Sequence, residues 1–191
     1  MRKNSQKIRE MVVIASLGAI VAVLQYISMF IKFGPFNITL ALTPIVVGAV
    51  LYGPKAGGVL GFIMGLVVLL TNAEAFFVVN PIATIFVCLF KSMFAGILAG
   101  LIIQWFKKIQ KNETISIILA SVITPIINTG IFVICCLLFF FPTLTEWANG
   151  ENTLVYLFVT MIGLQFVVEF LINAILSPVV IRLVDIVKNR R

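Results

Sequence analysis

The chain has 191 residues, of which 61% are hydrophobic and only 11% are charged, and its formal net charge is +7. A soluble domain carries roughly 25% charged residues, so this composition excludes a soluble protein and predicts an all-α integral membrane protein. A spanning helix needs about 20 apolar residues. We therefore expect residues 1–191 to form a single transmembrane domain with six spans and short connections.

Apolar runs, and the residues that interrupt them, predict six transmembrane helices. Gly34-Pro35, Tyr52-Gly53-Pro54-Lys55 and Asn80-Pro81 mark three sharp joints between them. The second and third helices are short, so we expect them to form a tilted or partly interrupted pair. The expected helices cover residues 9–31, 38–52, 56–72, 81–104, 115–141 and 154–187.

Positive charge gathers on one side of this arrangement. Lys and Arg near helix ends stay on the cytoplasmic side of a membrane, so the pattern predicts that both termini are cytoplasmic. We interpret the net charge as a topology signal and expect no nucleic-acid partner. The basic side carries Arg2, Lys3, Lys7, Arg9, Lys55, Lys107, Lys108, Lys111, Arg182, Lys188, Arg190 and Arg191, whereas the other side has Lys32 against Glu74, Glu146 and Glu151.

Two charged residues fall in the middle of expected helices, Lys91 in the fourth and Glu169 in the sixth. A charge at this depth costs several kcal/mol and usually faces the bundle interior. Both residues lie about 20 Å from the cytoplasmic ends of their helices, so they can meet at one level. Two hypotheses stay open. A buried Lys91–Glu169 ion pair could stabilise helix packing, or Lys91 could bind an anionic substrate in a cavity.

Amide and hydroxyl side chains recur at helical spacing around these charges. Asn80 and Thr84 share a face with Lys91, Gln165 and Asn173 share one with Glu169, and Asn128 follows the kink expected at Pro125. The pattern predicts a polar pocket between the fourth, fifth and sixth helices. Hydrogen bonds that only tie helices together, at about 0.6 kcal/mol each, are the alternative.

The outer connections add aromatic and amide residues that could cover such a pocket, although an interfacial aromatic belt would have the same composition. Trp147 is the aromatic candidate of this group. The candidate binding residues are Asn80, Thr84, Lys91, Asn128, Trp147, Gln165 and Glu169.

Small residues form stripes on three helices. For Gly57, Gly61 and Gly65 and for Ser92, Gly96 and Gly100, close packing inside the bundle is the default explanation. Ala15 and Ala19 lie one turn apart on the first helix. For that stripe, a docking face for another membrane protein is as good an explanation as internal packing.

Known catalytic and channel motifs are missing. The sequence contains no Walker A motif, HExxH motif, nucleophile elbow or paired-aspartate motif, so we expect no enzyme activity. It has no histidine, and its three cysteines lie inside apolar runs, so we expect no metal site. It also lacks a TVGYG filter and an Arg-rich voltage-sensing helix.

The chain resembles the substrate-binding S components of energy-coupling factor (ECF) vitamin transporters. The likeness rests on the six-span size, on Ala15-x-x-x-Ala19 after a basic N-terminus, and on the stretch FNITLALTPIVVGAVLYGPKAGGVLGF from Phe36 to Phe62. It covers nearly the whole chain, and its N-terminal third is the specific part.

This resemblance implies a multi-pass protein of the bacterial cytoplasmic membrane, in contact with lipid, that captures a vitamin from outside. The cavity would lie among the fourth to sixth helices, beneath the outer loops. The Ala15 and Ala19 face would dock onto an EcfT-like transmembrane coupling protein that carries two ATPase subunits. ATP hydrolysis in those partners would topple the binder and release the vitamin inward, so no cofactor is expected in this chain.

The sequence looks most like pantothenate-type members. Lys91 offers a cation for the carboxylate, and Asn80, Thr84, Asn128 and Gln165 could bind the amide and hydroxyls. The fourth to sixth helices show no dense aromatic clamp, which argues against flavin or folate. A pyridoxine or hydroxymethylpyrimidine binder, with Trp147 against the ring, is the alternative.

Two functions from other classes also stay open. A membrane scaffold would use the small-residue stripes only for helix association and would have no small-molecule ligand. A small channel or holin would conduct ions without any partner protein.

Overall fold

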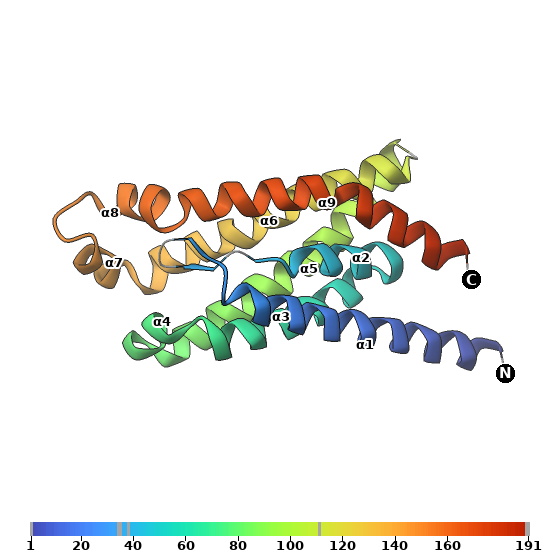
Figure 1. Ribbon diagram of the computed structural model, residues 1–191, viewed down its shortest axis with the longest axis horizontal. Helices are drawn as coiled ribbons and strands as arrows, with labels where there is room; N and C mark the ends of the chain where they lie inside the picture. Colours follow the sequence, from blue (N-terminus) through green and yellow to red (C-terminus); the bar gives the residue numbers. More distant parts are fainter. Residues whose placement is uncertain (1, 34–35, 38, 111, 190–191) are drawn as a thin grey trace.

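The computed structural model describes residues 2–33, 36–37, 39–110 and 112–189, and these residues form an elongated helical bundle (Figure 1). Five of its helices are long and apolar enough to cross a membrane. These are α1 (Arg2–Ser28), α3 (Pro54–Thr71), α5 (Pro81–Gln110), α6 (Glu113–Phe139) and α9 (Gly163–Asn189). Their existence confirms the expected all-helical membrane bundle, although some helix ends differ by up to nine residues from those expected.

The second expected span, residues 38–52, is wrong in extent, and its first residue lies outside the described part of the chain. Helix α2 covers only Leu42–Tyr52. Its 11 residues reach about 16 Å at 1.5 Å per residue, against about 30 Å of hydrocarbon. Before it, β1 (Lys32–Phe33) pairs antiparallel with β2 (Phe36–Asn37). Helix α3 has 18 residues, against 27 in α1, α6 and α9, so both members of the expected short pair are shorter than the other long helices.

Short helices occupy the outer connections, where loops were expected. They are α4 (Glu74–Val79), α7 (Phe141–Trp147) and α8 (Thr153–Val155). A π-helical segment, η1 (Tyr156–Met161), follows α8 and precedes α9. The expected sixth helix is thus divided, with α9 as its long apolar part.

Both ends of the described chain lie at the same end of the bundle (Figure 1). We call this the basic end, because Lys55, Lys107 and Lys188 belong to helix segments that terminate there. At this end Glu113 forms ion pairs with Lys107 and Lys188, which joins α5, α6 and α9. The opposite end, built by α4, α7 and α8, is called the loop end. The cytoplasmic location of the basic end stays a prediction of the charge pattern.

Helices α3 and α5 approach one another through glycine. A Cβ atom on Gly61 would lie 2.1 Å from the main-chain oxygen of Ser92, and one on Gly96 would lie 2.0 Å from the main-chain oxygen of Gly57. Only glycine permits such contact between backbones. Internal packing, the default explanation for these two stripes, is confirmed.

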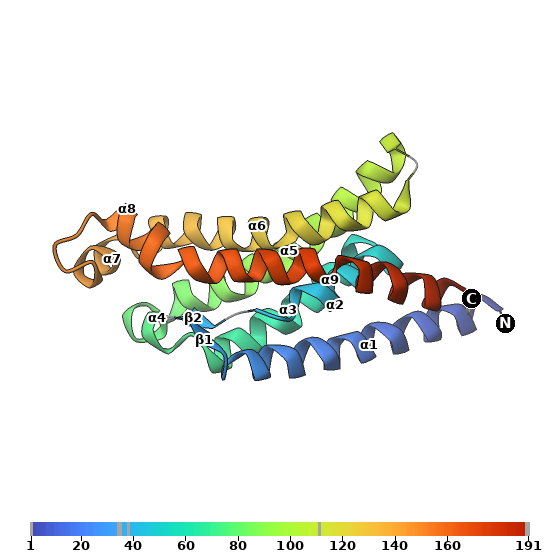
Figure 2. The ribbon, with the colours of Figure 1, turned by 45° about the horizontal axis from the view of Figure 1, so that its top comes forward.

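Helix α1 lies along the side of the bundle, next to α3 and α2 (Figure 2). Its inner face is set by residues at helical spacing, with Val21, Gln25 and Ser28 buried. Gly18 belongs to the same face, because a Cβ there would meet the Ile63 side chain. Ala15 and Ala19 are exposed on this helix.

Candidate functional site

A cavity of about 70 Å³ lies toward the loop end of the bundle. Long helices supply most of its wall, and the 39–41 segment and the start of α4 complete it. Lys91 and Glu169 are the charged residues among those described in the wall. The lining residues are Gln25, Thr39, Val68, Asn72, Ala73, Phe76, Thr84, Val87, Cys88, Lys91, Asn128, Thr129, Phe132, Phe140, Ile162, Gln165, Phe166 and Glu169.

The cavity draws on more of the bundle than was expected from the sequence. We expected it among the helices that correspond to α5, α6 and α9. Gln25 of α1 and Val68 of α3 also line it. Helix α2 is short and does not fill the interior beside α9. Gln25 of α1 and the non-helical residue Thr39 therefore line that part of the cavity.

Glu169 is buried, with 1% of its surface exposed. Its Oε1 accepts hydrogen bonds from the Thr39 backbone N–H at 2.7 Å and from Gln165 Nε2 at 3.1 Å. No ion pair joins it to Lys91, and the ion pairs found among the described residues are those of Glu113. The carboxylate instead satisfies a backbone group that would otherwise be buried without an acceptor.

Asn173 continues this polar contact along α9, one turn further from the loop end. Its Nδ2 donates to the Glu169 carbonyl at 2.8 Å, and its Oδ1 accepts from Thr43 Oγ1 at 3.2 Å. The bond with Thr43 ties α9 to the first turn of α2. Asn173 does not line the cavity, so its contacts fit the alternative explanation, in which such side chains tie helices together.

Lys91 enters the cavity from α5. Its Nζ lies 4.5 Å from the centroid of the Phe132 ring, within the range of a cation–π contact. No carboxylate pairs with it in the described structure. A cation that faces a cavity and has no ion-pair partner among the described residues can attract an anion.

Two amide side chains in the wall have no hydrogen-bond partner for their oxygens. Asn128 on α6 is 4% exposed and Gln25 on α1 is 1% exposed, and neither Asn128 Oδ1 nor Gln25 Oε1 is bonded. Thr84 is different, because its hydroxyl donates to the Asn80 carbonyl at 2.8 Å. Asn128, Thr84 and Gln165 thus reach the cavity as expected, whereas Gln25 was missed. The available signal was a lone glutamine inside the first apolar run.

Two of the expected residues lie outside the cavity wall. Asn80 is exposed and caps α5, where its Oδ1 accepts from the Ala83 N–H at 3.1 Å. Trp147 lies one layer further out, with its ring centroid 5.3 Å from that of Phe76. The helical spacing puts Asn80 on the same face as Thr84 and Lys91. Asn80 precedes the first turn of α5, however, so its side chain caps that helix.

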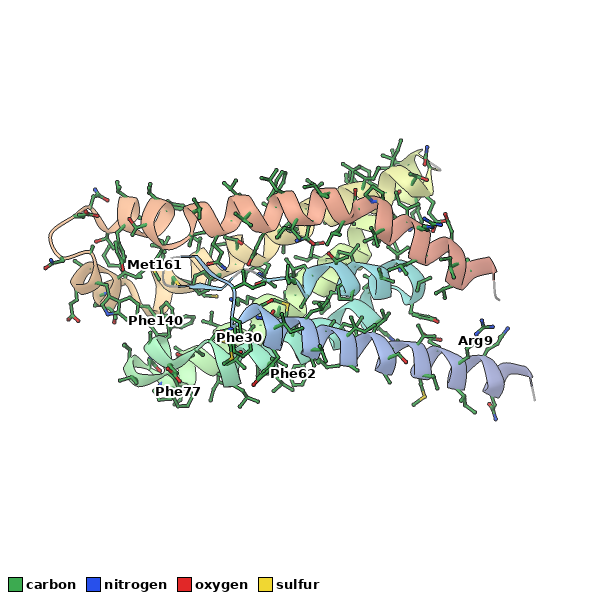
Figure 3. The ribbon with its side chains drawn as sticks, in the orientation of Figure 1. Arg9, Phe30, Phe62, Phe77, Phe140 and Met161 are labelled. Carbon is green, nitrogen blue, oxygen red and sulfur yellow. The ribbon has the colours of Figure 1, made fainter. Side chains whose placement is uncertain are left out.

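Phenylalanine residues from the loop end add to those of α6 and α9 in the cavity wall. Phe76, Phe132, Phe140 and Phe166 all line it. The Phe76 ring centroid lies 4.9 Å from that of Phe140 and 5.9 Å from that of Phe132. Phe140 and Met161 lie near one another at the loop end, whereas Phe77 points away from the bundle (Figure 3).

Comparison with protein-family models shows what kind of protein carries this cavity. Residues 9–181 match the model of the ECF transporter, substrate-specific component family. The chain belongs to this family. No curated protein matches it.

Members of the ECF substrate-specific component family are subunits of transporters, not enzymes, and they work with a module of membrane and ATPase subunits. The bundle of apolar helices is in keeping with a multi-pass membrane protein. The charged and amide groups of the cavity wall are the features of this ECF component that can select a substrate.

Proposed function

We propose that this substrate-specific component captures a water-soluble anionic vitamin, pantothenate in the first instance, from outside the cell. It then delivers the vitamin inward while docked on a transmembrane coupling protein with two ATPase subunits. The observation that carries the substrate proposal is Lys91, a cation in the cavity wall with no carboxylate partner among the described residues.

Pantothenate matches this wall in chemical type. It has one carboxylate for Lys91, and its amide and two hydroxyls can bond with Asn128, Gln165 and Glu169. The cavity of about 70 Å³ has room for only a few water molecules. Side chains around it must therefore move apart before a vitamin enters, and we expect the aromatic layer of Phe76 and Phe140 at the loop end to do so.

A pyridoxine or hydroxymethylpyrimidine binder is the second candidate. The observation that favours it is the phenylalanine content of the wall, because flat rings stack well on Phe132 or Phe166. Both vitamins are neutral or weakly charged rings, so neither would depend strongly on Lys91.

A comparison of pantothenate with pantothenol, which has an alcohol in place of the carboxylate, tests the role of Lys91. The purified protein should bind pantothenate more tightly, and Lys91→Met should lower that affinity about 10- to 100-fold, as expected for a charged hydrogen bond worth about 1.5–3 kcal/mol. The affinity for pantothenol should hardly change. Equal pantothenate binding by both proteins would remove the assigned role of Lys91.

A vitamin panel tested by native mass spectrometry separates the remaining classes of function. Preferential binding of pyridoxine would favour the second candidate. Binding of no vitamin would favour a membrane scaffold, and ion flux through liposomes that contain the purified chain alone would favour a channel.

The docking part of the proposal rests on the exposed Ala15 and Ala19 of α1. Bulky side chains there should block contact with the coupling protein. We expect Ala15→Leu/Ala19→Leu to abolish uptake in cells that carry the ATPase module while vitamin binding by the purified protein stays normal. Val167→Phe, at an exposed position on α9, is the control for added bulk.

A further inference from the structure

Gln25 is a polar residue of the cavity wall that forms no hydrogen bond through its side-chain oxygen. It lies on the buried face of α1 with Gly18, Val21 and Ser28, at a spacing that places all four toward the bundle. Ser28 has a clear structural role, because its Oγ accepts from the Leu40 N–H at 3.2 Å and donates to the Leu24 carbonyl. Gln25 Oε1 is buried and has no partner.

Asn128 presents the same condition from another wall of the cavity. Its Oδ1 is buried and unpartnered on α6, and both residues line the cavity that contains Lys91. Two other buried oxygens are unpartnered among the described residues, Ser92 Oγ and Ser121 Oγ, but neither serine lines this cavity. The two unpartnered amides are therefore gathered at the cavity.

A buried amide without a partner in the protein destabilises the fold unless a molecule in the cavity bonds to it. An apolar side chain of similar size would destabilise the folded protein less at either position. The physical account that fits both residues is a partner that enters and leaves the cavity.

We propose that Gln25 binds the transported ligand directly, together with Asn128. This inference rests on the proposed function and narrows the substrate class. An amide both donates and accepts, so the ligand should carry amide or hydroxyl groups between α1 and α6, in addition to the anionic group bound by Lys91. A hydroxylated or amidated carboxylate meets these requirements, and an apolar acid does not.

The variant Gln25→Leu tests this role, because leucine has a similar volume and cannot form hydrogen bonds. Without ligand, the melting temperature of the purified variant should equal or exceed that of the wild type, since an unpartnered amide has been removed. Its affinity for pantothenate should fall about tenfold or more, the equivalent of roughly 1.4 kcal/mol. Asn128→Leu should behave in the same way.

Ser121→Ala is the matched control, because it also removes an unpartnered buried oxygen but lies outside the cavity wall. It should leave pantothenate affinity unchanged. A clear drop in the ligand-free melting temperature of Gln25→Leu would show that Gln25 is structural and would overturn the inference. Unchanged pantothenate affinity in that variant, with normal binding by the wild type, would overturn it as well. Failure of the wild type to bind any vitamin would instead reject the proposed function on which the inference rests.

Discussion

The α3–α5 interface and the cavity are two parts of the same bundle with opposite physical character. At the interface, Gly61 and Gly96 let one backbone touch the next, and no space remains for even a methyl group. At the cavity, Lys91, Gln25 and Asn128 face space and lack the partners that their chemistry calls for.

The contrast predicts how each part responds to substitution. The interface should be sensitive to side-chain volume, because it has no room to relax. The cavity should be sensitive to polarity and charge, because its wall carries a cation and two amide oxygens without partners among the described residues. A closely packed pair of helices beside a cavity with unpartnered polar groups suits a protein that binds its ligand reversibly.

The largest effect should come from adding volume at the interface. In Gly61→Val, the new Cβ would lie 2.1 Å from the Ser92 main-chain oxygen, so α3 and α5 must separate. We expect a loss of about 3 kcal/mol or more, measured as unfolding in mixed detergent and SDS micelles. Gly130→Ala should be harmless, because a Cβ atom at that position would have nothing within 4 Å. Equal stability of the two variants would contradict the contrast.

The second effect concerns Glu169, which lines the cavity and also accepts a hydrogen bond from a backbone N–H group. Glu169→Leu removes the acceptor of the Thr39 N–H and should cost about 1–3 kcal/mol of stability. Glu169→Gln keeps an acceptor oxygen and should restore most of that loss, as the same unfolding measurement can show. If both variants were equally unstable, the charge of Glu169, and not its hydrogen bond to Thr39, would be the stabilising feature.

A smaller effect is expected at Asn80, which the structure assigns to a helix cap. Asn80→Ala should cost about 1 kcal/mol of stability and leave pantothenate affinity unchanged, as calorimetry on the purified protein can check. Asn80→Asp, which can still cap the helix, serves as the control. Weaker vitamin binding at unchanged stability would instead return Asn80 to the binding site.

The smallest effect should come from the ion pairs at the basic end, which lie outside both regions. Glu113 and its partners Lys107 and Lys188 are partly exposed, so Glu113→Gln should cost only about 0.2–1 kcal/mol. The difference from the wild type should shrink at high salt, because exposed charges are screened. Thermal unfolding at low and high salt measures it, and a large salt-independent loss would show that this cluster is essential to the bundle.

The parts of the fold that followed from the sequence are those with a strong local signal. Lys91 and Glu169 are conspicuous because a charge inside an apolar run is costly, and the glycine stripes repeat every four residues. Gln25 is uncharged and belongs to no repeat of polar residues at helical spacing, so the sequence pattern does not mark it as a cavity residue. The contact between Thr39 and Glu169 joins positions 130 residues apart, and no local pattern reports it.

The start of α2 shows a second limit. Residues 38–41, with the sequence ITLA, are as apolar as the helix itself, and an apolar run does not distinguish a helix from other backbone buried by protein. Only the surrounding helices decide, because they supply Glu169 and Ser28 as acceptors for the Thr39 and Leu40 N–H groups.

That segment also constrains the order in which the chain assembles during synthesis. The ribosome makes Thr39 long before Glu169, and an N–H without an acceptor costs several kcal/mol in hydrocarbon. The Thr39 N–H therefore gains this acceptor only after α9 has been made. A helix that is made later in the chain thus completes a contact that the earlier Thr39 segment needs.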